Sequence, residues 1–186
     1  MMHMEMYNTF VKLLFCDHGE SHNDCGRAVL IGKYLVTVGH NFDENEYLYF
    51  YQNAKRYYLY EKDALYIKAK PNYGKGDLDL AVFLFDEIDS CLKFPTKSPD
   101  ISDELSVVRL RGNLEKRLDL VKCTLEELES PYFLCSTNSL LYPGDSGSPI
   151  VDGDVVYGLL VGNPTKLSSD KIVFISLYDV VKDILN

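Results

Sequence analysis

Residues 144–149 of this 186-residue chain read Gly-Asp-Ser-Gly-Ser-Pro, and no other stretch says as much about its fold. Ser146 stands between an aspartate and a glycine, with Gly144 two positions before it. Glycine lets the backbone turn without a Cβ penalty, so the N–H groups of Gly144 and Ser146 can point at one shared acceptor. Paired N–H groups of this kind stabilise the oxyanion of a tetrahedral intermediate. Ser146 is therefore a candidate nucleophile, with Gly144 and Ser146 as a candidate oxyanion hole.

Upstream of this stretch, a short apolar run ends in a histidine. Residues 35–40 read Leu-Val-Thr-Val-Gly-His, and His40 is one of four histidines in the chain. A rigid strand end can hold an imidazole where it takes a proton from a serine, as general-base catalysis requires. His40 is therefore the candidate base. The alternative is a surface histidine that follows a strand.

Two aspartates compete for the role of orienting His40. Residues 76–84 read Gly-Asp-Leu-Asp-Leu-Ala-Val-Phe-Leu, which places Asp77 just before an expected strand and Asp79 at its start. Residues two apart in a strand point to the same face, so strand parity does not choose between them. The chosen aspartate would hold one tautomer of the histidine and stabilise the imidazolium, without taking the proton itself.

The three motifs resemble those of chymotrypsin-like serine proteases. That family ends its histidine strand with Thr-Ala-Gly-His or Thr-Ala-Ala-His and begins a later strand with Asp-(Ile/Leu)-Ala-(Leu/Val). The second pattern matches Asp79 better than Asp77, because leucine and alanine follow Asp79. The chain order His40, Asp79, Ser146 agrees with this family and differs from the orders in subtilisin and the α/β-hydrolases. The resemblance implies that these three residues form a catalytic triad.

Short apolar runs alternate with turn residues along the chain, which predicts an all-β protein. The expected strands are 8–16, 26–31, 34–39, 47–51, 56–60, 64–69, 79–85, 105–111, 118–124, 131–136, 149–152, 155–162 and 171–177. The resemblance implies two six-stranded antiparallel β-barrels and a short C-terminal helix, and residues 177–185 have the apolar spacing of a helix. It places an N-terminal barrel at 1–92, an interdomain connection at 93–100 and a C-terminal barrel at 101–186.

The five cysteines do not match the disulfide framework of the secreted members of this family. Those enzymes bridge the residue after the catalytic histidine to one about fifteen positions earlier. Cys25 stands at the earlier position, but Asn41 follows His40. Nothing like the zymogen N-terminus Ile-Val-Gly-Gly precedes the first strand, so Asp145 needs another partner. We expect a protease of a reducing, cytoplasmic compartment that is active without zymogen cleavage.

The compactness of the chain and these missing features are most similar to the serine-type 3C-like or main proteases of positive-strand RNA viruses. Intracellular bacterial trypsin-like peptidases are the close alternative. The resemblance implies an endopeptidase that performs limited processing of a polypeptide, with its own polyprotein among the candidate substrates. A catalytically inactive trypsin-fold binding module is the non-enzyme alternative. The implied mechanism uses neither a metal nor a cofactor.

The residues expected to bind the substrate are mostly apolar. Leu140 stands six positions before Ser146, where the family has the base of its primary pocket, and the segment around Leu160 resembles a wall of that pocket. An apolar pocket would leave a cation or amide unpaired at a cost of roughly 2–7 kcal/mol, so we predict a hydrophobic residue before the scissile bond. The alternative places the leucines in the barrel core. The predicted substrate-binding residues are Leu140, Leu141, Leu160, Val161, Gly162 and Asn163.

Two further sequence patterns are not predicted to form binding sites. No membrane-spanning segment is expected. Cys16, His18, His22 and Cys25 look like a zinc-ligand set, but their spacing fits no standard module, so a solvated turn is preferred. The basic residues within 109–117 are interpreted as a solvated hairpin, because a net charge of −9 does not favour binding to RNA. No apolar run approaches the ~20 residues that span a bilayer.

Overall fold

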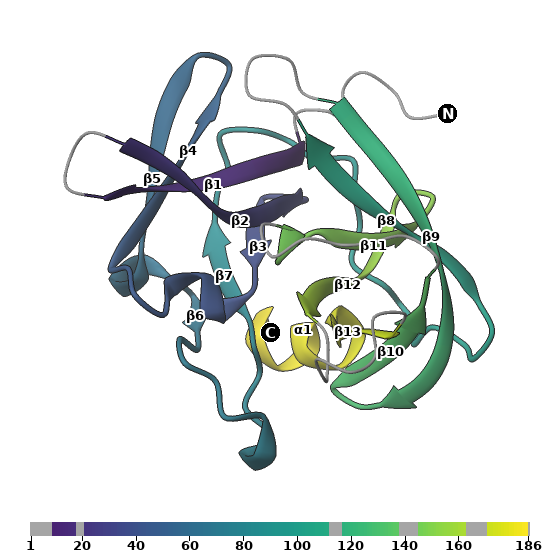
Figure 1. Cartoon of the computed structure of the whole chain (residues 1–186). Coiled ribbons are helices and arrows are strands. Elements are labelled where there is room, and N and C mark those ends of the chain that lie inside the picture. The colour runs from purple at the N-terminus through teal and green to yellow at the C-terminus, as the bar shows by residue number, and fades with distance from the viewer. Residues whose placement is uncertain (1–8, 18–20, 112–116, 138–144, 163–170, 186) are drawn as a thin grey trace.

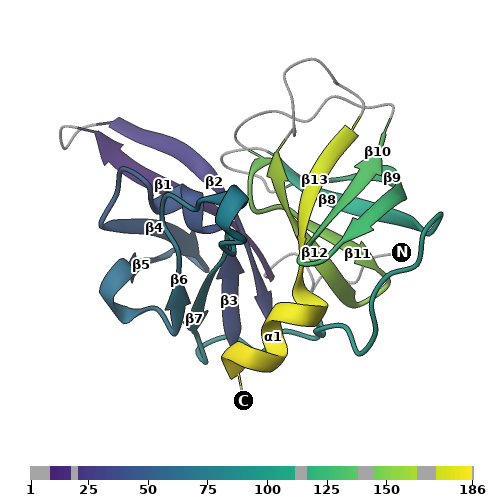
Figure 2. The same cartoon turned by 90° about the horizontal axis from the view of Figure 1, so that it is seen from below.

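The computed structural model describes residues 9–17, 21–111, 117–137, 145–162 and 171–185, without the side chains of residues 11–23 and 179. Two β-structures lie side by side, and a short helix lies against the seam between them (Figures 1 and 2). We call residues 9–92 the first half and residues 101–185 the second half. No helix among the described residues has the length and apolar character needed to cross a membrane.

The first half forms a seven-stranded antiparallel sheet. Its strands lie in the order β5-β4-β1-β2-β3-β7-β6, and the sheet is strongly curled in Figure 2. The strands are β1 (Phe10–Asp17), β2 (Ser21–Ile31), β3 (Tyr34–Thr37), β4 (Tyr47–Gln52), β5 (Lys55–Tyr60), β6 (Tyr66–Ile67) and β7 (Ala81–Leu84). Alternate residues point to opposite faces, so Leu30, Leu48 and Phe83 pack in one cluster while Val29 and Val82 pack in another.

The second half forms a closed six-stranded barrel in the order β10-β13-β12-β11-β8-β9. Its strands are β8 (Glu104–Arg111), β9 (Arg117–Glu129), β10 (Tyr132–Ser136), β11 (Pro149–Asp152), β12 (Val155–Gly162) and β13 (Lys171–Ser176). The helix α1 (Leu177–Leu185) follows β13 directly and packs against β12. On β8, Leu105 and Val107 face the barrel core, whereas Val108 and Leu110 face the first half.

The predictions of a mostly β chain and a short C-terminal helix are confirmed, but only one closed barrel is seen. Within the described residues, β5 and β6 stand at the two ends of the first sheet and do not pair with each other. One reason is that β6 has only two residues. The chain between β6 and β7 instead passes through a short 3-10 helix at Tyr73–Lys75. The first half is therefore a curled sheet rather than the predicted six-stranded barrel.

The zinc-like segment between Cys16 and Cys25 is mostly strand rather than a turn. β2 begins at Ser21 instead of residue 26, and the strand register places Cys16 opposite His22. His18 lies outside the described residues. Among the residues that the structure describes, no group of three His, Cys, Asp or Glu is arranged to hold a metal ion.

One cluster of buried apolar side chains joins the two halves. Val29 and Leu80 from the first half pack in the same cluster as Leu110 and Leu177 from the second. The chain between the halves is also attached to the barrel, because the N–H of Lys93 donates to the Asp154 carbonyl at 2.8 Å. The predicted domains, 1–92 and 101–186, stay a prediction. The shared cluster leads us to expect that the halves unfold together.

Replacing Leu177 tests this expectation. Leu177 is fully buried, so Leu177→Ala should lower the free energy of unfolding by about 2–5 kcal/mol and keep a single transition. Urea unfolding would be followed by far-UV circular dichroism and by tyrosine fluorescence. The chain has no tryptophan, and most of its 14 tyrosines lie in the first half.

The matched control is Leu65→Ala, because that leucine is 53% exposed. Its effect should stay within about 0.5 kcal/mol. Two separate transitions, one for each probe, would contradict the expectation that the halves form one cooperative unit.

Candidate active site

His40 lies at the end of β3, in a 3-10 turn formed by Gly39–Phe42. The residue before it must be glycine, because a Cβ at position 39 would overlap the carbonyl oxygen of Lys68. The neighbouring backbone therefore fixes where the turn begins. The imidazole remains partly accessible, with 27% of the side chain exposed.

Asp79 is fully buried and contacts His40 twice. One carboxylate oxygen accepts a hydrogen bond from the His40 backbone N–H at 2.8 Å, and the other lies 2.6 Å from His40 Nδ1. The Asp77 carboxylate has other partners. Its carboxylate accepts a hydrogen bond from the Asn72 N–H at 2.9 Å and lies 3.7 Å from Lys68 Nζ. Of the two aspartates that strand parity could not separate, Asp79 is the one that contacts His40.

Two tyrosine hydroxyls complete the surroundings of Asp79. The Tyr73 hydroxyl donates to Oδ2 at 2.5 Å, the same oxygen that faces His40 Nδ1. The Tyr132 hydroxyl comes from the second half, accepts from the Asp79 N–H at 3.0 Å and donates to the Asp77 carbonyl at 2.7 Å. Sequence reasoning missed both tyrosines, because neither belongs to a motif and 12 other tyrosines have the same local appearance.

Both hydroxyls keep their protons at neutral pH. Burial raises the pKa of Tyr132 to about 12 and outweighs the hydrogen bond with the Asp79 backbone, which lowers it. Burial also raises the pKa of Tyr73, and the hydrogen bond to Asp79 adds to it. Tyr73 therefore remains a donor to the carboxylate.

The surroundings raise the pKa of His40 above its ordinary value of 6.5. Burial is the largest single effect and lowers the pKa, because it disfavours the charged ring. The hydrogen bond and charge of Asp79, together with the charge of Asp43, outweigh it. The protonated ring is therefore favoured, and His40 becomes neutral only above this raised pKa.

Ser146 lies in the turn before β11 and is held by groups from the first half. Its carbonyl oxygen accepts from the Arg27 N–H at 2.8 Å and from Asn41 Nδ2 at 3.3 Å. Asn41 follows His40 directly, so Ser146 is attached to the turn that carries the histidine. Gly147 has a φ of +95°, and a Cβ there would overlap the Arg27 carbonyl oxygen. Glycine is therefore required after Ser146.

Arg109 is the partner of Asp145. Arg109 Nη2 lies 3.2 Å from Asp145 Oδ2, and the two side chains are 7% and 5% exposed. The ion pair ties the turn before Ser146 to β8 in the wall of the barrel. The interpretation of the basic segment as a solvated hairpin is wrong for Arg109, because its guanidinium is buried. Arg111 does lie near the surface, where its Nε is 3.0 Å from an Asp119 oxygen.

Cys25 contacts residue 41 without a disulfide. Its Sγ–H donates to the Asn41 carbonyl oxygen at 3.2 Å. Burial, together with the charges of Asp24 and Asp43, raises the pKa of Cys25 to about 12, so the thiol stays protonated. The cysteines whose side chains the structure describes are all free thiols: Cys25, Cys91, Cys123 and Cys135.

The other predicted site residues are only partly placed. Four of them lie outside the described residues: Leu140, Leu141, Gly144 and Asn163. Leu160 is buried and packs in the barrel core, and its carbonyl accepts from the Gly147 N–H at 2.9 Å. Val161 and Gly162 end β12 and are partly exposed. The role of Gly144 in the oxyanion hole and the roles of the other six residues in substrate binding stay predictions.

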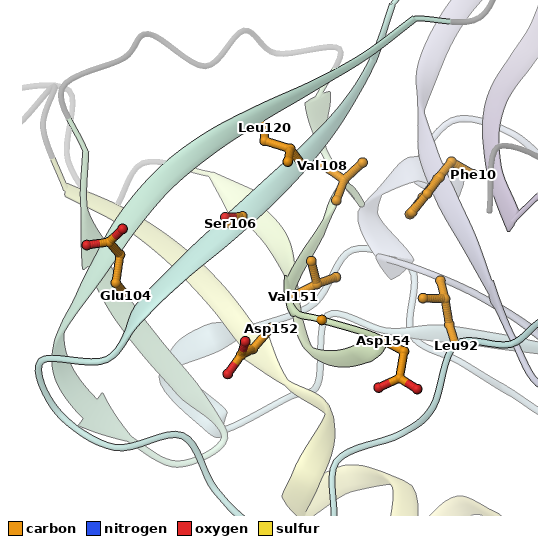
Figure 3. A pocket seen from close by; sticks show the side chains of 10 residues that line it. Phe10, Leu92, Glu104, Ser106, Val108, Leu120, Val151, Asp152 and Asp154 are labelled. Atoms are coloured by element: carbon orange, nitrogen blue, oxygen red, sulfur yellow. The ribbon is translucent and has the colours of Figure 1, made fainter. Parts of the chain in front are cut away.

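One cavity, of about 390 Å³, is lined mostly by the second half, with Phe10 and Leu92 contributed by the first half (Figure 3). Figure 3 shows Phe10 and Val108 among its apolar lining, with Glu104 and Asp154 at its edge. Glu104 pairs with Lys122 at 3.4 Å, and Asp154 with Lys93 at 3.5 Å. None of the predicted triad residues lines this cavity, so it is not part of the candidate active site.

Comparison with solved structures shows that the fold of this chain is similar to that of several proteases. The Rv3671c protease of M. tuberculosis in its active form has a TM-score of 0.70 and 14% identity, over 97% of this chain and 81% of that chain. Catalytically active tobacco etch virus protease complexed with product has a TM-score of 0.70 and 13% identity, over 98% and 78%. The scabies mite inactivated protease paralogue S-I1 has a TM-score of 0.70 and 14% identity, over 97% and 94%.

The chain therefore has the chymotrypsin-like protease fold. No protein-family model matches the sequence, and no curated protein matches it. The fold is shared by an active and an inactivated protease among these structures, so activity has to be argued from the site residues.

The buried ion pair gives a test of how the turn before Ser146 is held. Arg109→Met should lower the free energy of unfolding by about 3–5 kcal/mol, because it leaves Asp145 buried without its cation. The double variant Arg109→Met/Asp145→Asn should recover part of this loss. Urea unfolding of both single variants and the double variant would give the coupling energy.

Arg111→Met is the matched control, since it removes an arginine from the same strand but from a largely exposed pair. It should cost less than about 1 kcal/mol. A cost for Arg109→Met no larger than that of this control would contradict a structural role for the buried pair.

Proposed function

We propose that the chain is a serine endopeptidase in which Ser146, His40 and Asp79 form the catalytic triad. The observation that supports this most directly is the pairing of His40 Nδ1 with the buried Asp79 carboxylate at 2.6 Å. In the same turn, Asn41 follows His40, and its side-chain amide donates to the Ser146 carbonyl oxygen. The backbone of the proposed nucleophile is thus hydrogen-bonded to the turn that carries the proposed base.

In the proposed reaction, Ser146 Oγ attacks the carbonyl carbon of a peptide bond and His40 Nε2 takes the hydroxyl proton. The N–H groups of Gly144 and Ser146 hold the resulting oxyanion. The C–N bond then breaks as His40 gives its proton to the leaving amine, which leaves an acyl group on Ser146. Water, deprotonated by His40, releases the acyl group as a carboxylic acid and restores the serine.

Asp79 stays ionised through this cycle. Its contact with Nδ1 keeps the proton on that nitrogen, which leaves Nε2 as the acceptor for the serine proton. The hydroxyl of Tyr73 donates a hydrogen bond to the same carboxylate oxygen and so stabilises its negative charge. All protons move among Ser146, His40, the substrate and water, so the proposed chemistry has no step that calls for a metal or a cofactor.

The Arg109–Asp145 ion pair supports an enzyme that is active once folded. In zymogens of this fold, a newly cut N-terminus supplies the cation for the aspartate before the serine. Here Arg109 supplies a cation from within the barrel, at 3.2 Å. The turn can therefore take its shape without a cleavage step.

The role that we propose is limited processing of a polypeptide, and the sequence resemblance favours cleavage of a viral polyprotein. A non-catalytic binding module is the second candidate, because one structure of the same fold is an inactivated protease paralogue. The contact between His40 and Asp79, and the placement of Ser146 beside their turn, favour the enzyme.

Labelling with a fluorophosphonate probe tests the proposal. The probe should attach to the wild type, and Ser146→Ala should abolish labelling. His40→Ala should slow labelling by roughly 10⁴-fold, because the serine then loses its base. The rate would be followed by in-gel fluorescence, with mass spectrometry to locate the modified serine.

Ser148→Ala is the matched control from the same motif. The buried Ser148 Oγ has no hydrogen-bond partner among the described residues, so its removal should leave the fold intact and labelling at Ser146 in place. A folded wild type that takes up no probe would refute the serine-protease proposal and favour the binding module.

The pH dependence should follow His40. The base works only when neutral, so the labelling rate should be high above the His40 pKa and fall as the pH drops through it, with a midpoint above 6.5. Asp43→Asn removes one of the charges that raise this pKa, so the midpoint should move to lower pH. The asparagine keeps the oxygen that accepts from the Lys70 N–H at 2.5 Å.

Asp63→Asn serves as the control, because Asp63 is not among the groups that shift the pKa of His40. Its midpoint should equal that of the wild type. An unchanged or higher midpoint in Asp43→Asn would contradict the assignment of His40 as the titrating base.

A further inference from the structure

A cavity of about 460 Å³ opens between the two halves, beside Asp79. The first half contributes the turn that carries Tyr73, Gly74 and Gly76. The second half contributes the hairpin of β9 and β10, including Tyr132. The two glycines have no side chains to fill the space. The cavity is therefore a place where a side chain from outside can enter between the halves.

The cavity has an aromatic side next to Asp79. The rings of Tyr73 and Tyr132 meet edge to face, with centroids 5.8 Å apart. Both hydroxyls are turned to Asp79, one to its carboxylate and one to its N–H. A group inside the cavity would thus touch the same rings that hold Asp79 in place.

The lining of the cavity also includes aliphatic and acidic side chains. The strand register places Glu129 opposite Tyr132 and Glu127 opposite Leu134, so these side chains share the outer face of the barrel. Leu134 and Val173 supply apolar surface beside the two glutamates. Within the described part of the chain, no cation pairs with Glu127 or Glu129. The cavity therefore combines apolar walls with two carboxylates that have no such partner.

We infer that this cavity selects a lysine or arginine side chain of the polypeptide substrate. The methylene groups of such a side chain would lie on Leu134 and Val173, and its charged end would reach Glu127 and Glu129. The tyrosine rings add attraction for a cation. An acidic side chain would meet two like charges at the same place and be rejected.

The selected residue is not the one whose carbonyl is attacked. Neither Ser146 nor His40 lines the cavity, so we assign the basic residue to a position of the substrate away from the scissile bond. This inference rests on the proposed function, and it is separate from the predicted hydrophobic preference directly before the scissile bond.

A peptide library with every position varied in turn tests the inference. Wild type should favour Lys or Arg over norleucine at one position away from the scissile bond, by at least about tenfold in kcat/KM. The double variant Glu127→Gln/Glu129→Gln should lose most of that ratio. The ratio compares two substrates of the same enzyme, so a change that lowers kcat/KM equally for both substrates leaves it unchanged. Glu127→Lys/Glu129→Lys should turn the preference toward Asp and Glu.

Glu126→Gln is the matched control, because Glu126 is exposed on the same strand and bonds to Ser136 instead of lining the cavity. It should keep the wild-type ratio. Probe labelling of Ser146 without a basic preference, or with one that survives the double variant, would overturn this inference alone. Absence of labelling in folded wild type would overturn the proposed function and this inference with it.

Discussion

The hydrogen bonds of Asp79, through both its carboxylate and its backbone N–H, are the constraint on which the contact between the two halves depends. A fully buried charge is costly unless hydrogen bonds replace the water that it loses. His40 and Tyr73 from the first half bond to the carboxylate, and Tyr132 from the second half holds the adjacent N–H. The residue is thus satisfied only when both halves are folded and in contact.

The second half also depends on contacts from the first half. The turn that carries Ser146 belongs to the second half, but Arg27 and Asn41 of the first half hold its carbonyl oxygen. Inside the second half, the buried pair of Arg109 and Asp145 ties the same turn to β8. Breaking such a pair by removing one partner is strongly destabilising. Stability and the geometry of the candidate site therefore share the same contacts.

Much of the fold could be predicted because its signals are local. Strands such as Tyr47–Gln52 and Pro149–Asp152 follow from short apolar runs bounded by turn residues. The predicted strand bounds were wrong where pairing with a distant strand decides how long a strand is. β2 begins at Ser21 because it continues the hairpin with β1, and only two residues of the expected strand 64–69 form β6.

The sequence by itself determined the residue types and order of the candidate triad, since these are motifs of a few neighbouring residues. The family pattern favoured Asp79 over Asp77, and the tertiary structure shows Asp79 in contact with His40. Only the tertiary structure decided that Arg109 is the partner of Asp145. It also decided that Tyr73 and Tyr132 share Asp79. The physical reason is that these contacts satisfy buried polar groups across the fold, and the residues that meet there are distant in the chain.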